Sequence, residues 1–363
     1  MRLKNPNDKD AIDNSGGTIF TIGSYKLGVN GPTSDIDALC VAPKDIDRTL
    51  HFFGMLAPKL KEIPGIKALT EVKEAFVPVI KMEFDGVEID LLFARVDRKK
   101  IDSEIGDLTD DSILRNCDEK CVRSLAGSRD TNKILNLVPN KAHFELVLRC
   151  IKLWAKNRGI YSNVLGYFGG ITWALLVAKI CIDNRDAQPN KLLARFFEFY
   201  STYPWDERYP IRITEIRDDT PTPQGMKLDE SRKVAPGWLR GNLMPVITPT
   251  FPLMNSSHNV SRQTKEVLLQ ELEKGAIITR AILKGEKVPW NRLFKKFCFF
   301  RAFQHFIQVS ILSAGLEEHD KWLGFAESKI KKIVEFLSNK GQLDFLELRT
   351  FPNAYATESC RPE

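Results

Sequence analysis

Two aspartates separated by one residue, Asp35 and Asp37, follow a Gly23-Ser24 turn in the stretch GSYKLGVNGPTSDIDAL. Carboxylates held this close repel each other and gain nothing from shared burial. In an extended strand, side chains at positions i and i+2 point to the same side, so the two carboxylates would project together. Oxygen ligands of this kind suit hard divalent cations such as Mg²⁺ and Mn²⁺. The pair therefore predicts a metal site.

A third acidic residue, Asp90, interrupts the apolar run of VEIDLLFARV, which is predicted to be a central strand. A charge in such a strand is costly unless it is paired or bound to metal. Two alternatives stay open: Asp90 ends the strand at the surface, or Glu88, on the same face, is the exposed partner instead. Three converging carboxylates would hold two cations. One cation would activate a hydroxyl, and Asp90 would act mainly on this cation. The other would neutralise charge on a triphosphate and on its pyrophosphate leaving group.

The Gly23-Ser24 turn offers what a phosphate needs. A tight turn that enters a helix presents backbone N–H groups, glycine allows close approach, and the serine hydroxyl adds a donor. Such turns are common on protein surfaces, so this one carries weight only together with the aspartates. The combination predicts a nucleoside triphosphate held above two metal ions, with no histidine or cysteine nucleophile.

Strand-like segments fill the first hundred residues and must position these groups. They are GTIFTIGSY, DIDALCVAP, FVPVIKMEF and DGVEIDLLFARV, and the last two predict a hairpin about Asp85-Gly86. Between them, Ile46 to Leu60 has helical spacing. We expect a small α/β domain over residues 1–110, built around a mixed sheet.

From about Asp110 the apolar spacing becomes helical. A stripe along 142–160 predicts an amphipathic helix, and GGITWALLVAKICI, apolar nearly all round, predicts an interior helix. Residues 203–252 are rich in Pro, Gly and charge and predict a long connection that follows the surface. A helix over 261–283 is expected to begin at Ser261 as N-cap. The last predicted helix, 327–340, has Gly341 after its end and a buried side formed by Ile330, Ile333, Val334 and Leu337.

Composition limits the classes of protein that remain. The chain has 363 residues, 43% hydrophobic and 28% charged, which is typical of a globular protein with two or three domains. A polar start and the lack of a long apolar run predict neither a secretory signal nor a membrane span, and hence an intracellular protein. The seven scattered cysteines predict reduced core thiols, and the close pair Cys117 and Cys121 lacks further ligands for zinc.

A net charge of +6 permits an anionic partner without requiring one. Basic and aromatic residues alternate late in the chain. Two interpretations stay open: an amphipathic helix with its charges in water, or a surface that meets a phosphate backbone. The residues are Trp290, Arg292, Phe294, Lys295, Lys296, Phe297, Phe299, Phe300, Arg301 and Phe303.

Gly-Ser, Asp-x-Asp and a later strand Asp together resemble the nucleotidyltransferase superfamily, and the surrounding sequence resembles the eukaryotic poly(A) polymerases. The similarity extends in order through AFVPVIKMEFDGVEIDLLFAR, LRNCDEKCVRSLAGSR, IKLWAKNRGIYSNVLGYFGGITWALLVAKIC, MPVITPTFP and WLGFAESKIKKIV. It implies an α+β multidomain fold. The catalytic domain would cover 1–110, a helical central domain 111–300, and the beginning of a C-terminal RNA-binding domain, similar to an RNA recognition motif, 301–363. The resemblance also leads us to expect a chain shortened at both ends.

Residue roles follow from the resemblance only at matching positions. Asp35, Asp37 and Asp90 would bind two Mg²⁺ or Mn²⁺ ions, Lys152 and Tyr161 would contact the triphosphate of ATP, and Asn163 would help read adenine. Lys81 is a further candidate for RNA or nucleotide phosphates. Ile22 stands where the family usually has Phe, a change expected to leave the turn intact. The complete implied nucleotide site is Ile22, Gly23, Ser24, Asp35, Ile36, Asp37, Asp90, Lys152, Tyr161, Asn163, Gly170 and Ile171.

The function implied is template-independent transfer of AMP from ATP to the 3′ end of messenger RNA. Two alternatives stay open. One is a terminal uridylyltransferase or noncanonical poly(A) polymerase, which shares the metal triad, and the other is a catalytically silent RNA-binding homologue. The family further implies a nuclear monomer that works with proteins of the cleavage and polyadenylation complex.

Overall fold

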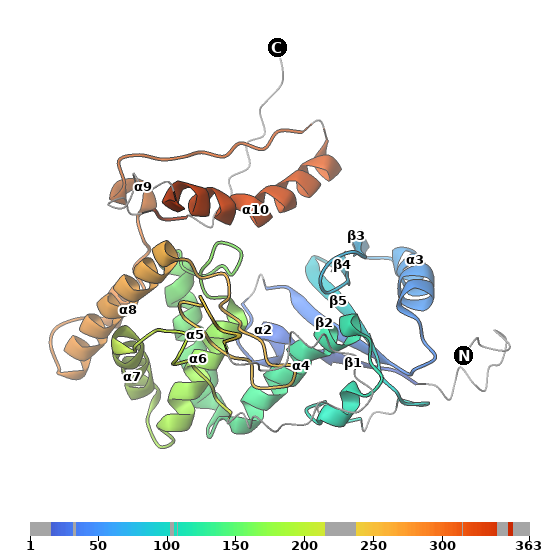
Figure 1. Ribbon diagram of the computed structural model, residues 1–363, viewed down its shortest axis with the longest axis horizontal. Helices are drawn as coiled ribbons and strands as arrows, with labels where there is room; N and C mark the ends of the chain where they lie inside the picture. The colour runs from blue at the N-terminus through green and yellow to red at the C-terminus, as the bar shows by residue number, and fades with distance from the viewer. Residues whose placement is uncertain are drawn as a thin grey trace, which may run out of the picture.

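The computed structural model describes residues 16–31, 34–101, 105–106, 108–214, 237–313, 315–339 and 348–350. Figure 1 shows a sheet with its flanking helices on one side of the molecule and a group of long helices on the other. A long C-terminal helix lies above the helical group. The prediction that strands come first in the chain and helices later is therefore confirmed.

The sheet has five strands in the order β1-β2-β5-β4-β3. Strands β2 and β5 are parallel, and the other neighbours are antiparallel. The strands are β1 Thr18–Thr21, β2 Ile36–Ala42, β3 Ile66–Val72, β4 Val79–Phe84 and β5 Val87–Arg95. The predicted hairpin about Asp85-Gly86 is confirmed: both residues have positive φ, 48° and 83°, as a two-residue turn of this twist requires.

The two faces of the sheet pack on different elements. One face packs through Ile80, Leu91 and Phe93 on Phe52 and Phe53 of a π-helix, Arg48–Leu56, which continues into α3, Ala57–Lys61. These two elements occupy the predicted helix 46–60. On the other face, Leu39, Val41 and Ala94 pack on α4, Glu119–Leu137. Since side chains alternate along a strand, Asp37 and Asp90 fall on the face of α4.

Four further helices form the central region and share one apolar core. They are α5 Lys141–Asn157, α6 Gly170–Asp183, α7 Pro189–Thr202 and α8 Arg262–Leu283. The predicted amphipathic stripe of α5 is confirmed, because its members Phe144, Val147, Leu148, Ile151, Trp154 and Ala155 are all buried. The interior position of α6 is also confirmed, because nine of its 14 residues are buried. Ser261 caps α8 as predicted, with its side chain accepting a hydrogen bond from Thr264 N.

The prediction that 203–252 follows the surface is wrong for Met244–Thr250, all of which are buried. This stretch has no helix or extended strand, so isolated backbone bridges and side chains together satisfy its backbone. Val246 N donates to Asn255 Oδ1 (3.1 Å), and Thr250 N donates to Asp130 Oδ1 (3.2 Å). Polar partners elsewhere in the chain thus permit an irregular segment to be buried. Residues 215–236 of the predicted connection lie outside the described residues.

The basic and aromatic segment 290–303 is not one amphipathic helix. It contains a 3₁₀ turn, Trp290–Arg292, and a short helix, α9 Phe299–Ala302, with an irregular stretch between them. Helix α10, Leu316–Asn339, is longer than predicted. Ile330 packs on the central core, but Ile333 is 40% exposed, so its predicted burial is wrong. The side chains of Val334 and Leu337, and all of Gly341, lie outside the described residues.

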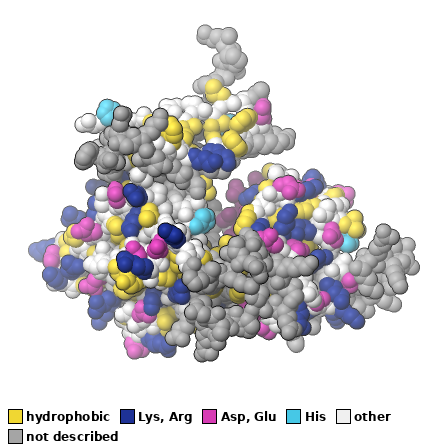
Figure 2. All heavy atoms as spheres, in the orientation of Figure 1, with side chains coloured by type: hydrophobic (Ala, Val, Ile, Leu, Met, Phe, Trp, Pro, Cys, Tyr) yellow, Lys and Arg dark blue, Asp and Glu magenta, His cyan; other side chains and the backbone are white. Residues whose placement is uncertain are grey.

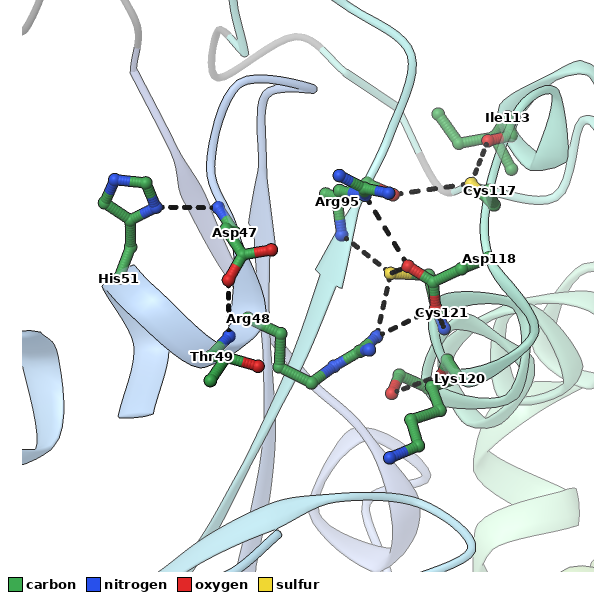
Figure 3. Close-up of polar contacts among 11 residues, drawn as sticks. Asp47, Arg48, Thr49, His51, Arg95, Ile113, Cys117, Asp118, Lys120 and Cys121 are labelled. Carbon is green, nitrogen blue, oxygen red and sulfur yellow. Dashed lines mark hydrogen bonds and ion pairs between the residues drawn. The ribbon is translucent and has the colours of Figure 1, made fainter. Parts of the chain in front are cut away.

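Cys117, Cys121 and Cys181 are buried thiols, as predicted, but Cys298 is exposed, so the prediction of a core thiol is wrong there. Cys117 and Cys121 lie beside the end of β5 (Figure 3). Cys117 Sγ donates to Arg95 O (3.4 Å), and Arg48 Nη2 donates to Cys121 Sγ (2.9 Å). Burial raises the pKa of each thiol to about 12, which keeps it protonated. Their role is therefore packing. Among the described residues, no helix is long and apolar enough to cross a membrane.

Candidate active site

Three carboxylates converge at one end of the two inner strands β2 and β5, which we call the sheet edge. Asp35 directly precedes β2, Asp37 lies within β2, and Asp90 lies in β5. Asp37 and Asp90 are direct partners in the parallel ladder, so they share a face. One oxygen from each aspartate lies within 4.8 Å of the others, and among the described residues no other acidic, histidine or cysteine group gathers in this way. Glu88 pairs instead with Glu83 and is exposed.

The charge of this cluster is unbalanced. Burial, together with the charges of Asp35 and Asp90, raises the pKa of Asp37 to about 6, and Lys81 acts in the opposite direction. Carboxylates that repel each other and offer several oxygens at short range fit a hard divalent cation, which would remove the repulsion. The donor set of this site therefore fits the metal ions that the sequence predicts.

Lys81 contacts the carboxylate cluster directly. It faces Asp90 across the β4–β5 ladder, and its Nζ lies 2.5 Å from Asp90 Oδ2. The lysine side chain is 53% exposed, so it can turn toward solvent or a ligand without losing buried contacts. Lys81 thus contacts one of the three clustered carboxylates, an ion pair that the sequence alone did not indicate.

The Gly23-Ser24 turn lies against Asp37. Gly23 has φ of 60° and begins the short helix α2, Gly23–Lys26. A Cβ atom on Gly23 would overlap the Asp37 carboxylate, and Ile22 N donates to Asp37 O at 2.9 Å. Glycine is therefore required here both by backbone conformation and by close approach. Ile22 is buried, and the turn keeps its form with isoleucine at this position.

Helix α5 brings cations to the opposite side of the site. Lys152 Nζ donates to Val29 O (2.9 Å), in the loop that follows α2. Burial and the charges of Lys156 and Arg149 lower the pKa of Lys152 to about 8, against the opposing effect of Asp35. Lys152 is thus a partly desolvated cation within the electrostatic field of the carboxylates.

Sequence reasoning missed two other basic residues of α5. Arg149 donates to Gly28 O through Nε (2.9 Å), and Lys156 Nζ lies 5.5 Å from the centre of the Tyr161 ring. Arg149, Lys152 and Lys156 are spaced by three and four residues, so they share a helix face. That spacing was the available signal.

Tyr161 lies between α5 and α6. Burial and the charge of Asp35 raise the pKa of its hydroxyl. A Cβ atom on Gly170 would lie 2.9 Å from Tyr161 Oη, so Gly170 leaves room for the tyrosine at the start of α6. Ile171, the next residue, is partly buried against the central core. Ile36 pairs with Ile89 beside the aspartates in the ladder.

The side-chain oxygen of Asn163, Oδ1, is buried in this region and has no hydrogen-bond partner among the described residues. Its backbone carbonyl accepts from Asn259 Nδ2 (3.2 Å) and Gly166 N (3.1 Å), which fixes the turn. A buried acceptor without a partner is costly, so a ligand donor at this point would be favourable.

The sheet and the central helices form two bodies with a recess between them in the space-filling view (Figure 2). The C-terminal region, by which we mean the described residues of 298–350, lies above this recess and presents hydrophobic and basic side chains toward it. The carboxylates come from the sheet side, while Lys152 and Tyr161 come from the helical side. This arrangement suits a polyanion that bridges the two.

Three family models match consecutive parts of the chain. Residues 1–138 match the poly(A) polymerase nucleotidyltransferase domain, 143–296 the poly(A) polymerase central domain, and 298–361 the poly(A) polymerase predicted RNA binding domain. Together these matches extend over nearly the whole sequence.

Curated relatives agree with the domain matches. The chain is 44% identical over 330 residues to a poly(A) polymerase of Dictyostelium discoideum, covering 90% of this chain and 39% of the relative. It is 42% identical over 332 residues to nuclear poly(A) polymerase 1 of Arabidopsis thaliana, covering 92% and 45%. The chain therefore spans less than half the length of these two relatives.

Among solved structures, the Cid1 poly(U) polymerase bound to Mg 3′-dATP is similar with a TM-score of 0.52 and 15% identity, covering 77% of this chain and 86% of that chain. At this identity the likeness shows the nucleotidyltransferase fold alone. The domain matches and the curated relatives, added to the carboxylate geometry, lead to one conclusion: the chain belongs to the poly(A) polymerase family.

Proposed function

We propose that this chain is a template-independent polynucleotide adenylyltransferase, which adds AMP from ATP to the 3′ end of RNA and releases pyrophosphate. The observation that carries the proposal is the convergence of Asp35, Asp37 and Asp90 within 4.8 Å. The family relationship supports the same reaction, since the curated relatives are named poly(A) polymerases.

Asp35, Asp37 and Asp90 would hold two divalent cations, Mg²⁺ or Mn²⁺. When bound, such ions lower the pKa of an attacking hydroxyl and neutralise charge on a triphosphate. The unbalanced negative charge of the three carboxylates supports this role, because burial and like charge already raise the pKa of Asp37 to about 6.

The triphosphate would lie between the Gly23-Ser24 turn and helix α5. Lys152 and Lys156 supply positive charge, and the Tyr161 hydroxyl, whose pKa is raised by burial, stays protonated and can donate a hydrogen bond. Lys152 already bonds to Val29 O in the loop after α2, so it is positioned at the side of the turn. These residues bind and orient ATP while the carboxylates act at the reacting phosphate.

Adenine would be read beside Asn163, with Gly170 and Ile171 as the wall of the base pocket. The buried Oδ1 of Asn163 accepts no hydrogen bond among the described residues, and the adenine edge offers an amino donor. A site that pairs with such a donor disfavours a base that presents an acceptor there. This supports ATP over UTP as the substrate.

Extension of an oligo(A) primer with each of the four nucleotides, in Mg²⁺ and separately in Mn²⁺, tests the proposal. We expect ATP to be preferred, with release of pyrophosphate. A preference for UTP would contradict adenylation and favour a terminal uridylyltransferase. No incorporation of any nucleotide would favour a silent RNA-binding homologue.

Base selection can be tested separately from metal chemistry. Asn163→Ala should reduce the preference for ATP more than it reduces the maximal rate. Equal loss with all four nucleotides would contradict a base-reading role for Asn163. The matched control is Asn184→Ala, because this asparagine caps the far end of α6.

The partners and location follow from the family. We propose that the RNA 3′ end belongs to messenger RNA, that the chain works as a monomer with cleavage and polyadenylation proteins, and that it acts in the nucleus. Relatives named nuclear poly(A) polymerases support the location. Nuclear enrichment of the tagged chain in cell fractions is the expected result, and a cytoplasmic distribution would contradict it.

A further inference from the structure

The junction between the central and RNA-binding matches, at Phe297, is fastened to the end of helix α5. The central match ends at 296 and the next begins at 298. Asn157 Nδ2 donates to Phe294 O (2.7 Å), and Phe297 N donates to Asn157 O (2.8 Å). Arg158 Nη1 donates to Lys295 O (3.1 Å). Three hydrogen bonds thus join this junction to two consecutive residues.

A buried carboxylate lies behind this junction. Glu271 of α8 is only 1% exposed, and Arg158 binds it through Nε (2.6 Å) and Nη2 (3.1 Å). Lys274 and Arg349 also contact Glu271, at 3.2 Å and 3.3 Å. We call Arg158, Glu271, Lys274, Phe297 and Arg349 the Glu271 cluster. Its members come from α5, α8, the junction and the C-terminal region, so it links all of them.

Arg349 attaches the C-terminal region to the cluster through contacts with Phe297, Arg158 and Glu271. The Phe297 ring centre lies 3.6 Å from the Arg349 guanidinium and 5.4 Å from that of Arg158. Arg349 Nη2 also donates to the backbone oxygen of Arg158 (2.6 Å). A desolvated arginine on an aromatic face, with a carboxylate and a carbonyl as further partners, is a stronger contact than a surface ion pair.

Arg158 lies in the short stretch between two residues of the triphosphate side. Lys156 precedes it by two positions, and Tyr161 follows it by three. The intervening turn is tightly held: Gly159 has φ of 69°, Ile160 N donates to Ala155 O (2.9 Å), and Ile160 is fully buried. Because this turn is held in place, a shift of Arg158 would move Tyr161 as well.

From these contacts we propose that the Glu271 cluster positions the nucleotide site: by docking the C-terminal region on Arg158, it sets the place of Tyr161 and thereby the affinity for ATP. The proposal rests on the function proposed above. Arg158, Glu271 and Arg349 are positioning residues, because they act through Tyr161 and do not touch the substrate.

The test is Arg349→Met in the 363-residue chain, with Arg349→Lys as the conservative variant. Methionine removes the charge and the stack, while Arg158 and Lys274 still neutralise Glu271. The control is Arg195→Met, because Arg195 forms an exposed ion pair on α7. Calorimetric titration gives the Kd of ATP with Mg²⁺ in the absence of RNA, and oligo(A) extension gives kcat. Hydrogen exchange of residues 158–163 reports on the turn.

We expect Arg349→Met to raise the Kd of ATP about five-fold, the size of an ordinary coupling between distant groups, while kcat stays within about two-fold of the parent. Exchange in 158–163 should become faster, Arg349→Lys should recover part of the affinity, and Arg195→Met should change nothing. These results would support the proposal.

Unchanged ATP affinity in a folded Arg349→Met chain would overturn it, even if the C-terminal region exchanges faster, because the cluster would then be an anchor only. If Arg349→Met fails to fold, Arg349→Lys decides the question by the same comparison of Kd. A parent chain that does not bind ATP contradicts the proposed function itself, which distinguishes that failure from a failure of the coupling.

Discussion

The carboxylates at the sheet edge and the carboxylate of the Glu271 cluster differ in how their charge is balanced. At the sheet edge three aspartates share one lysine contact, and the pKa of Asp37 is raised to about 6. In the Glu271 cluster one carboxylate contacts three cations. Burial by itself would raise the pKa of Glu271, but Arg158, Lys274 and Arg349 hold it below its ordinary value.

This difference separates a binding site from a structural one. A cluster that is neutralised by its own chain has no need of an outside ion, and its geometry serves to hold elements together. A cluster left with excess negative charge needs a cation from elsewhere. The balance of charge, more than burial, therefore marks the three aspartates rather than Glu271 as the candidate group for chemistry.

Removing one member of the sheet-edge triad should have the largest effect. Asp37→Asn keeps the size of the side chain but removes one carboxylate of the proposed metal site, and we expect AMP transfer to fall by about a thousand-fold, equivalent to about 4 kcal/mol. Primer extension and pyrophosphate release measure it. Asp85→Asn, at the hairpin turn, is the matched control and should retain full activity. Near-normal turnover by Asp37→Asn would contradict the catalytic role proposed for the three aspartates.

Removing the buried carboxylate should act on stability instead. Glu271→Ala leaves Arg158 and Arg349 without their common partner, so we expect the free energy of unfolding to fall by about 3 kcal/mol in urea titrations. Glu198→Ala breaks the exposed pair with Arg195 and should change stability by less than about 1 kcal/mol. Similar losses in the two variants would show that Glu271 is not the specially held group that its contacts indicate.

Asp130 is a buried carboxylate of a third kind, because burial raises its pKa to about 7 without a contribution from like charges. Thr250 donates to it, and the Arg129 charge opposes the shift. The ordinary value is 3.8, so the folded chain keeps a proton that the unfolded chain loses, and stability falls as pH rises from about 4 to about 7.

Asp130→Asn should abolish that part of the pH dependence. Relative to the parent, the variant should gain about 2 kcal/mol in free energy of unfolding between pH 5 and pH 7. Urea titrations at several pH values measure the difference. Parallel stability curves for the two chains would mean that Asp130 does not titrate in this range.

The smallest expected effect concerns Lys81. Because Lys81 lowers the pKa of Asp37, Lys81→Gln should raise that pKa further, by a fraction of a pH unit. Carboxylate NMR titration with a chelator present measures it. Lys67→Gln, on the edge strand β3, is the control. A lower pKa of Asp37 in Lys81→Gln would contradict the assigned charge balance.

The sequence was most informative where local pattern and tertiary environment agree. The all-round apolar run of α6 predicted an interior helix, because burial on all sides selects apolar residues. The Asp85-Gly86 pair predicted its hairpin, because positive φ in a tight turn favours Asp and Gly. The Asp-x-Asp spacing likewise predicted a shared face. Convergence with Asp90 depended on strand pairing, which the sequence could only indicate through a charge in an apolar run.

Contacts between distant residues were beyond the reach of local pattern. Met244–Thr250 was expected at the surface from its composition, yet hydrogen bonds to Asn255 and Asp130 permit its burial. Glu271 gave no signal, since Arg158 and Arg349 are 113 and 78 residues away in the chain. The periodicity of 290–303 fits a helix, but docking of Phe297 on α5 holds that stretch irregular.

The parallel pairing of β2 and β5 has a consequence for how such a chain can vary. Asp37 faces Asp90 because the two strands are in fixed register, although β3, β4 and two helical segments lie between them in the sequence. Insertions or deletions at the outer turns of that excursion can lengthen or shorten it while the aspartates stay opposed. A single-residue slip within either strand would turn one aspartate to the other side of the sheet.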